Sequence, residues 1–323
     1  MNILITGAAG FIGSNLADKL LEEGNIIYAL DNFCDYYPVY LKRQNVENNL
    51  NNPNYKLFEG DVLDNSFLDY VFQNPIDCVI HLAGQGGVRP SIEKPINYIE
   101  ENVIASVNIL EKMKKYNVKK IVFASSSSVY GNCNEEKFSE DFKISKPVSP
   151  YAATKISSEL FLYTYSYLYN INAIALRFFT VFGPRQRPDL AIRKFIDLIE
   201  DDKPLPLYGD GTTCRDYTYI DDIIDGIKRA INYNIDGFEV FNLGAGSPVS
   251  LRQMVQTIEK VLNKKAKIEY LPMQEGDVLR TSCDISKARD LLGYNPKINF
   301  EDGIKKYIKW KNENNLTKKA LQS

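Results

Sequence analysis

The sequence has one histidine, few cysteines and no long apolar run, and each scarcity excludes a class of protein. The five cysteines form no Cys-x-x-Cys pair; they are Cys34, Cys78, Cys133, Cys214 and Cys283. Because one histidine and scattered thiols cannot supply a common zinc shell or a disulfide framework, we expect no metal site and a reducing, cytoplasmic location. No stretch approaches the roughly 20 apolar residues that span a bilayer, and the N-terminus lacks the basic start of a signal peptide.

The sequence also lacks an excess of either charge. Its 39 basic and 41 acidic residues leave a net charge of −2. The chain therefore has no excess of positive charge with which to bind nucleic acid or an anionic membrane. We therefore expect neither as a partner. With 323 residues, 44% hydrophobic and 25% charged, the composition is typical of a soluble globular chain with one large or two modest domains.

Short apolar runs alternate with longer helical patterns in the first half of the chain. Parallel strands need a crossover of a dozen or more residues, and these spacings provide it. The pattern predicts an α/β fold with a doubly wound parallel sheet of the Rossmann type. The expected strands cover residues 3–6, 26–30, 55–58, 78–82, 120–124 and 173–177.

The pattern changes after Gly183, where prolines and glycine-rich turns become frequent. Helical patterns then recur at about 189–200, 221–232 and 250–262, with short strands near 217–219 and 239–242. We predict a sheet domain over 1–177 with a return near 216–243. The remaining segments, 178–215 and 244–323, would form a smaller α/β domain.

A glycine motif, Gly7-x-x-Gly10-x-x-Gly13, lies between the first expected strand and a helical pattern. Glycines at this spacing permit a sharp turn, the approach of a helix N-terminus to a pyrophosphate, and packing of the helix on the strand. The alternative is a glycine-rich turn without a ligand. The strand, the helix and an acid that follows the second strand all favour a dinucleotide.

That acid, Asp31, follows the second expected strand, where a carboxylate accepts hydrogen bonds from an adenosine ribose. A 2′-phosphate there would meet a like charge, so NAD is favoured over NADP. Asp61 could reach the adenine or could only cap a turn. The expected cofactor-binding residues are Gly7, Gly10, Phe11, Ile12, Gly13, Asp31, Asn32, Asp61, Val62, Leu82 and Ala83, with Tyr151 and Lys155 of the next motif.

A catalytic pair is expected on the helix that Pro150 begins. Tyr151 and Lys155 lie four residues apart, on one face and one turn from each other. A lysine ammonium and a nicotinamide ring would lower the pKa of the phenol toward working pH. A hydroxyl from the serine run 125–128 would complete a triad able to take a proton from a sugar alcohol while hydride leaves for NAD.

These motifs resemble those of the extended short-chain dehydrogenases/reductases, in the nucleotide-sugar epimerase group, over nearly the whole chain. The resemblance gives Ser126, Tyr151 and Lys155 as the catalytic triad. Segments 177–184, 209–216 and 276–280 resemble the family's substrate-domain motifs. It implies that Arg215 and Arg280 hold a nucleoside diphosphate.

Ser127 and Ser128 separate the reactions of this group. Similar 4,6-dehydratases carry Asp-Glu at these two positions, and similar UDP-glucuronate decarboxylases carry Glu at the second. A hydroxyl cannot replace a carboxylate as the acid or base of elimination or decarboxylation. Epimerisation at C4 is therefore favoured over both reactions. A binding protein that kept the fold and lost the chemistry remains an alternative, and the intact triad argues against it.

Three stretches, 31–37 with 41–43, 87–89 and 179–189, resemble UDP-glucuronate 4-epimerases in particular. We therefore expect conversion of UDP-glucuronate to UDP-galacturonate, with UDP-glucose or UDP-N-acetylglucosamine as alternative substrates. A hydroxyl cluster that includes Thr180 could bind the C6 carboxylate without promoting decarboxylation. The expected substrate-binding residues are Arg89, Ser127, Ser128, Thr180, Arg187, Arg215 and Arg280.

Two further expectations concern the sole histidine and the oligomer. His81 ends the fourth strand, where a hydrogen-bonded structural role is favoured over acid–base catalysis. The helices at about 98–116 and 151–169 are apolar on more than one face. As in relatives, we expect the second face to form a homodimer, the alternative being that the C-terminal domain covers it.

Overall fold

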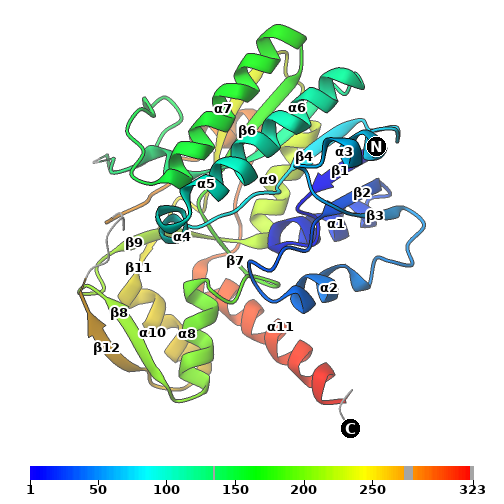
Figure 1. Cartoon of the computed structure of the whole chain (residues 1–323). Helices are drawn as coiled ribbons and strands as arrows, with labels where there is room; N and C mark the ends of the chain where they lie inside the picture. The colour runs from blue at the N-terminus through cyan, green and yellow to red at the C-terminus, as the bar shows by residue number, and fades with distance from the viewer. Residues whose placement is uncertain (134, 273–278, 321–323) are drawn as a thin grey trace.

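Seven parallel strands form the central sheet, in the order β10-β6-β5-β4-β1-β2-β3 (Figure 1). The computed structural model describes residues 1–133, 135–272 and 279–320. The strands are β1 Asn2–Thr6, β2 Ile26–Asp31, β3 Tyr55–Glu59, β4 Cys78–His81, β5 Lys120–Ser126, β6 Asn172–Phe178 and β10 Phe238–Leu243. The predicted doubly wound sheet is confirmed, and the six strands expected in the first half are all present.

The sheet buries both of its faces, as its near-continuous apolar strands require. Successive side chains of β1 alternate between the faces: Ile3 and Ile5 belong to one hydrophobic core and Leu4 to the other. Helices α1 Phe11–Glu22 and α9 Ile220–Asn232 pack on the first face. Helices α3 Asn65–Val71, α6 Ala105–Lys115 and α7 Pro150–Tyr169 cover the second.

The strand order reverses between β1 and β4, which places the carboxyl ends of these two strands beside a crevice. Where the connections that follow two neighbouring strands run to opposite faces of the sheet, they leave a crevice between them. Ligands bind in this crevice in this class of fold. The helices around it are α2 Val39–Glu47, α4 Val88–Glu93 and α5 Pro95–Tyr98. Between α5 and α6 the chain forms a π-helix, η1 Ile99–Ile104, where the sequence predicted one regular helix.

A smaller lobe lies beside the carboxyl edge of the sheet (Figure 1). Its strands form a sheet of β7 Thr180–Phe182, β9 Cys214–Tyr219 and β11 Pro248–Ser250, and a pair of β8 Pro204–Tyr208 and β12 Lys267–Leu271. Its helices are α8 Ala191–Glu200, α10 Leu251–Leu262 and α11 Phe300–Ala320. The short elements η2 Ser127–Tyr130 and η3 Ala288–Leu292 complete the chain.

The chain passes between the lobes more than once. The expected strand at 217–219 is β9, which pairs with β7 and β11, whereas the strand at 239–242 is β10, which joins the central sheet beside β6. Domain boundaries at 177, 216 and 243 stay a prediction. Within the described residues, no helix is long and apolar enough to cross a bilayer.

Candidate active site

The glycine loop joins β1 to α1 at the reversal of the strand order, and its glycines are sterically required. Gly7 has φ +70°, and a Cβ added to it would lie 2.8 Å from the Ala83 nitrogen. A Cβ added to Gly13 would lie 2.2 Å from the Gly7 oxygen. The loop therefore packs against the end of β4 and against α1 as closely as only glycine permits.

Asp31, at the end of β2, holds this loop in place. Its Oδ2 accepts the Ala9 N–H at 3.0 Å and its Oδ1 accepts the Phe33 N–H at 2.8 Å. Asp61 has a local role: it accepts the Leu63 N–H at 2.8 Å and the Asn32 amide at 3.0 Å. Asp61 thus supports a turn and orients Asn32, which itself faces the crevice.

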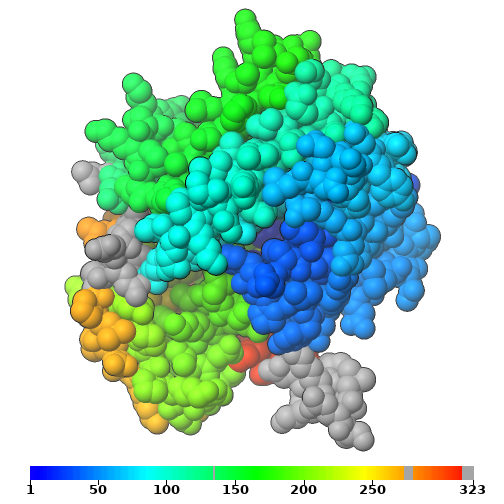
Figure 2. Space-filling model, viewed as in Figure 1, coloured from blue at the N-terminus to red at the C-terminus, as the bar shows by residue number. Residues whose placement is uncertain are grey.

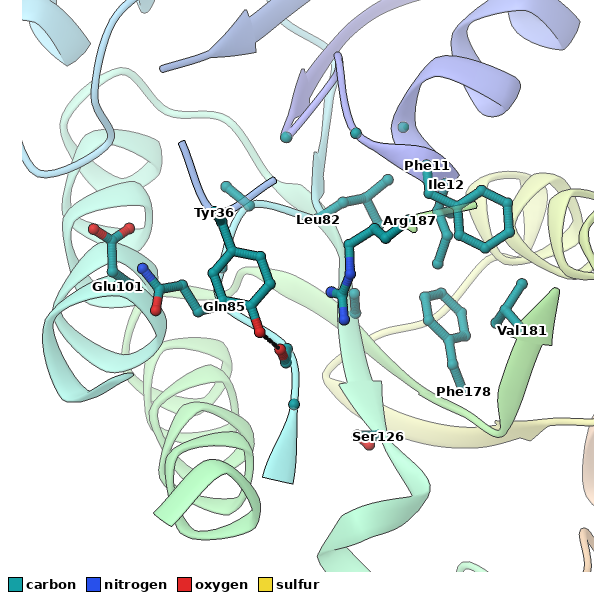
Figure 3. Close-up of a pocket in the computed structure, with 18 of the residues that line it drawn as sticks. Phe11, Ile12, Tyr36, Leu82, Gln85, Glu101, Ser126, Phe178, Val181 and Arg187 are labelled. Carbon is teal, nitrogen blue, oxygen red and sulfur yellow. Dashed lines mark hydrogen bonds between the residues drawn. The ribbon is translucent and has the colours of Figure 1, made fainter. Parts of the chain in front are cut away.

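A cavity of about 550 Å³ runs from the glycine loop to the end of β5 (Figure 3). The predicted site residues that line it are Gly7, Gly10, Phe11, Ile12, Gly13, Asp31, Asn32, Val62, Leu82, Ala83, Ser126, Ser127, Ser128, Tyr151, Lys155, Thr180 and Arg187. The predicted residues that do not line it are Asp61, Arg89, Arg215 and Arg280. Of the predicted motif 276–280, residues 276–278 lie outside the described part of the chain.

Ser126, Tyr151 and Lys155 meet where β5 ends against α7. Ser149 caps this helix by accepting the Ala152 N–H at 3.1 Å, so the tyrosine lies in the first turn. The Lys155 Nζ donates to the Ala124 oxygen at 2.9 Å and lies 6.0 Å from the centroid of the Tyr151 ring. The strand end thereby fixes the ammonium beside the phenol.

The electrostatics of this triad differ from the sequence expectation. Burial raises the pKa of Tyr151, while hydrogen bonding by Ser126 and the charge of Arg187 lower it in part. Burial also lowers the pKa of Lys155, from its ordinary 10.5 to about 8. Without the nicotinamide ring that the sequence expectation included, the pKa of Tyr151 is raised and not lowered, because desolvation outweighs the neighbouring groups.

Hydroxyl groups form the wall of the cavity beyond the triad. The Ser126 Oγ lies 3.2 Å from the Ser128 Oγ and accepts the Ser128 N–H at 3.2 Å. Thr180 begins β7 on the facing segment. Among the described residues that line the cavity, the only carboxylates are Asp31 and Glu101, and in Figure 3 Glu101 lies across the cavity from Ser126.

Arg187 and Arg89 span the gap between the lobes. The Arg187 guanidinium donates to both oxygens of Asp189 at 3.0 and 2.9 Å, stacks 5.2 Å from the Tyr36 ring and points into the cavity (Figure 3). Arg89, on α4, lies 5.4 Å from the Tyr208 ring of β8. Both arginines thus form contacts between the lobe of the central sheet and the smaller lobe.

The other two predicted arginines come together on the smaller lobe. Arg215 lies on β9, and the backbone of Arg280 pairs with its neighbour Cys214 in a parallel bridge. The Arg280 side chain is exposed, and Arg215 donates to the Cys214 oxygen at 2.9 Å. The bridge places Arg215 and Arg280 on adjacent backbone segments of this lobe.

A buried ion pair joins α7 to β6, and the sequence analysis missed it. Glu159, one turn after Lys155, accepts two hydrogen bonds from Arg177 of β6, at 3.0 and 2.8 Å. Ser125 also donates to Glu159, and Arg177 donates to the Tyr130 hydroxyl at 2.9 Å. The available signal was a charged residue within an otherwise apolar, fully covered strand.

His81 has the structural role that the sequence predicted. It is buried, its Nδ1 lies 2.7 Å from the Thr6 hydroxyl, and its Nε2 lies 3.2 Å from the Ser106 hydroxyl. Burial lowers its pKa to about 3, so the ring is neutral at working pH.

Asn102 is another buried residue that the sequence analysis missed. Its side chain accepts the Gln85 N–H at 2.8 Å and donates to the Gln85 oxygen at 3.1 Å.

The chemistry of the cavity fits a dinucleotide. A narrow glycine loop at a helix N-terminus suits a pyrophosphate, and the carboxylate at the end of β2 suits a ribose diol. The Tyr37 hydroxyl, on the same wall, is buried without a hydrogen-bond partner in the structure. The lining supplies polar groups at both ends of an otherwise apolar cleft, as binding sites for large ligands do.

The chain is similar in sequence and in fold to nucleotide-sugar enzymes. Residues 4–307 match the family model described as GDP-mannose 4,6 dehydratase. The UDP-glucuronate 4-epimerase of Thermodesulfobacterium geofontis is 43% identical over 313 residues, 96% of each chain. A crystal structure of UDP-glucuronic acid 4-epimerase from Bacillus cereus with UDP-glucuronic acid and NAD has a TM-score of 0.90 and 36% identity, and covers 97% of this chain and 99% of that one.

Another structural neighbour was solved with a different nucleotide sugar. The UDP-glucose 4-epimerase of Thermotoga maritima, solved with UDP-glucose, has a TM-score of 0.90 and 31% identity, and covers 97% of this chain and 99% of that one. The matches extend over nearly the full length in every case. The chain therefore belongs to the extended short-chain dehydrogenases/reductases, in the nucleotide-sugar epimerase group.

Proposed function

We propose that this protein is an NAD-dependent 4-epimerase that converts UDP-glucuronate to UDP-galacturonate. One observation carries the proposal: the Ser126, Tyr151 and Lys155 triad opens into a wall of hydroxyls in the same cavity as the glycine loop. The B. cereus and T. geofontis relatives are named for this activity and share 36% and 43% of their residues with this chain.

In this mechanism Tyr151 moves the proton of the sugar 4-hydroxyl. NAD, held by the glycine loop and Asp31, would supply the acceptance and return of hydride at C4. The phenolate oxygen of Tyr151 takes the 4-hydroxyl proton as the C4–H bond breaks. The Ser126 hydroxyl donates a hydrogen bond to this phenolate oxygen. The sugar turns in the cavity, and Tyr151 gives the proton back after hydride returns to the other face of C4.

The positive charges near Tyr151 make this proton transfer possible at neutral pH. Burial opposes formation of the phenolate, so stabilisation must come from neighbours. Arg187 supplies part of it, and the ammonium of Lys155, protonated below a pKa of about 8, lies against the same ring. Burial of Tyr151 strengthens each of these interactions.

The hydroxyl wall suits a sugar that carries a C6 carboxylate. Ser127, Ser128 and Thr180 can donate hydrogen bonds to a carboxylate without supplying a strong acid. Loss of CO₂ from the 4-keto acid, or of water across C5 and C6, needs an acid or base that these residues lack. Epimerisation is the reaction that remains.

The nucleoside diphosphate would be held by arginines of the smaller lobe. Arg215 and Arg280 lie on adjacent backbone segments, and guanidinium groups bind phosphate oxygens through paired hydrogen bonds. Arg89 and Arg187, at the rim between the lobes, are further candidates for contact with the anionic substrate. UDP is thus expected to lie between the lobes with its sugar toward Tyr151.

The direct test is the product of an incubation without added cofactor. Purified protein is mixed with UDP-glucuronate, UDP-glucose or UDP-N-acetylglucosamine, and the sugars are identified by NMR. We expect UDP-galacturonate from the first substrate and much slower turnover of the neutral sugars. Faster turnover of UDP-glucose, or release of a pentose, would overturn the assignment of substrate or of reaction.

The same proposal includes a homodimer and a reducing compartment. Apolar side chains are exposed on α4, α5, η1 and α7, including Ile96 of α5 and Leu160 and Leu168 of α7, at 62%, 62% and 57% exposure. An apolar surface of this kind on paired helices suits a second copy of the chain. All five cysteines are free thiols, which supports a cytoplasmic location.

A further inference from the structure

The segment between β7 and α8 crosses from the smaller lobe to α1. Asn15 of α1 donates to the Pro184 oxygen at 3.1 Å, and the Nη1 of Arg185 lies 2.8 Å from the Oδ2 of Asp18, one turn further along the helix. The other carboxylate oxygen of Asp18 accepts from the Asn49 amide at 2.5 Å. A hydrogen bond and an ion pair thus join the two lobes at one place on α1.

Arg185 occupies a turn position that favours glycine. The Gln186 N–H donates to the Gly183 oxygen at 3.1 Å, which closes a β-turn with Pro184 second and Arg185 third. The φ of Arg185 is +67°, in the left-handed region that the third position of a type II turn requires and that Gly or Asn adopts most easily. An arginine held in this conformation indicates that its side chain makes a contact that outweighs the strain.

The ion pair with Asp18 is that contact. The side chains of Arg185 and Asp18 are 15% and 30% exposed, so solvent screens their attraction only in part. Neither residue lines the cavity, whereas Arg187, two residues later, lines it and points into it (Figure 3). Because Gln186 between the two arginines is buried at 1% exposure, a displacement of Arg185 should also displace Arg187.

Arg187 is a cation of the smaller lobe that acts on the catalytic tyrosine. Its charge lowers the pKa of Tyr151 in part, against the effect of burial. The larger lobe contributes the other groups around this phenol, which are Ser126, Tyr36, Lys155 and Tyr98. The electrostatic stabilisation that Arg187 gives to the phenolate therefore depends on how the two lobes are joined.

We propose that Asp18 and Arg185 are positioning residues, whose ion pair fixes the smaller lobe on α1 and thereby holds Arg187 beside Tyr151. The inference deepens the proposed function, since it rests on Tyr151 as the group that takes the sugar proton. Both residues lie outside the cavity and act through Arg187. Breaking their pair should therefore impair the chemical step and leave the catalytic side chains themselves intact.

Arg185→Gly separates positioning from stability. Glycine removes the ion pair but suits the third position of the turn, so the free energy of unfolding should stay close to that of the unaltered protein. We expect kcat with UDP-glucuronate to fall about 3- to 10-fold at pH 7. The acid limb of the pH–kcat profile should move to higher pH, since a base whose pKa rises by one unit is ionised about tenfold less below that pKa.

Asp18→Asn breaks the pair from the other side and should have the same effect, even if Arg185→Gly does not fold. The exchange Asp18→Arg/Arg185→Asp restores opposite charges, and aspartate tolerates a positive φ, so kcat should return to within about threefold of normal. Lys228→Met is the matched control. It breaks a pair with Glu23, just after α1, that lies within the larger lobe, so kcat should change less than about twofold.

Arg187→Met shows whether the pair acts through Arg187. Added to this variant, Arg185→Gly should lower kcat by less than about twofold, because the cation that it positions is already absent. A full further loss in that background, or Arg185→Gly with a normal kcat and an unchanged pH profile, would overturn the proposal. A normal rate for Tyr151→Phe would instead overturn the proposed function on which it rests.

Discussion

At the level of single residues, the proposed catalysis depends on whether the Tyr151 phenol can ionise. Burial raises its pKa, and Ser126 and Arg187 lower it in part. The sequence revealed the tyrosine and lysine one helical turn apart. It could not reveal the depth of burial or the approach of Arg187 from another lobe, because both depend on tertiary packing.

Tyr151→Phe removes the proton acceptor and retains the ring. We expect kcat to fall by about 10³-fold or more, since a positioned acid–base group contributes about 10²–10⁴-fold. Bound NAD, released by denaturation and quantified, should stay unchanged. Tyr163→Phe, on the exposed face of the same helix, is the control and should turn over normally. A Tyr151→Phe enzyme of normal rate contradicts the mechanism.

Lys155→Met should stabilise the cofactor-free protein at pH 7. The folded pKa of Lys155 is about 8 against an ordinary 10.5, so between these values the unfolded state binds more protons and stability rises with pH. Below pH 8 the buried charge costs up to about 3 kcal/mol, partly offset by its hydrogen bond to Ala124. Methionine removes this cost.

The measurement is the difference in unfolding free energy between the variant and the unaltered protein, from denaturant titrations at pH 7 to 10.5. The advantage of Lys155→Met should shrink across this range. Lys143→Met, at an exposed position, controls for the loss of a surface charge. An advantage that is independent of pH would refute the lowered lysine pKa.

At the scale of elements, the Glu159–Arg177 pair fixes α7 against β6. Both side chains are buried, at 4% and 3% exposure. Glu159→Gln leaves an unpaired guanidinium inside the protein, and we expect a loss of about 3–5 kcal/mol in urea unfolding. Because Glu159 raises the pKa of Lys155, the same change should lower that pKa further.

A double variant separates the pair from general damage. Glu159→Leu/Arg177→Met replaces both charges with apolar groups, and should cost less than the sum of the single changes. Costs that simply add would show that the two side chains act independently. Cavity creation in the double variant would affect its absolute stability, but the coupling energy is the measured quantity.

Elements were more predictable than the contacts between them. Apolar runs separated by long segments revealed six strands of the sheet and its class, because parallel strands must be covered on both faces. The π-helix was not predicted, since its sequence, Ile99–Ile104, continues an ordinary helical pattern. The polar residues Asn102 and Glu159 were missed because their partners lie on elements distant in the chain.

At the scale of the whole molecule, the exposed face of α7 predicts how two copies meet. Figure 2 shows the side chains of this helix projecting from the surface of the larger lobe. The alternative that the smaller lobe covers this face is wrong for the described residues, because Leu160, Tyr167 and Leu168 are 57–77% exposed. These residues recur at helical spacing and form a single apolar stripe.

Charges on this stripe should separate the dimer. Leu160→Lys/Leu168→Lys should convert a dimer into a monomer, as measured by size-exclusion chromatography with light scattering, because a buried unpaired charge opposes association. Leu279→Lys, 72% exposed on the smaller lobe, should leave the dimer intact. A monomeric unaltered protein, or a double variant that stays dimeric, would rule out this interface.

In the proposed mechanism one carbon of the sugar is oxidised and then reduced by the same bound cofactor, while Tyr151 moves only a hydroxyl proton. UDP-glucuronate that carries deuterium at C4 tests it directly, with NMR of the product formed in ordinary water. We predict UDP-galacturonate that retains the deuterium at C4. Replacement of that label by solvent hydrogen would contradict the account.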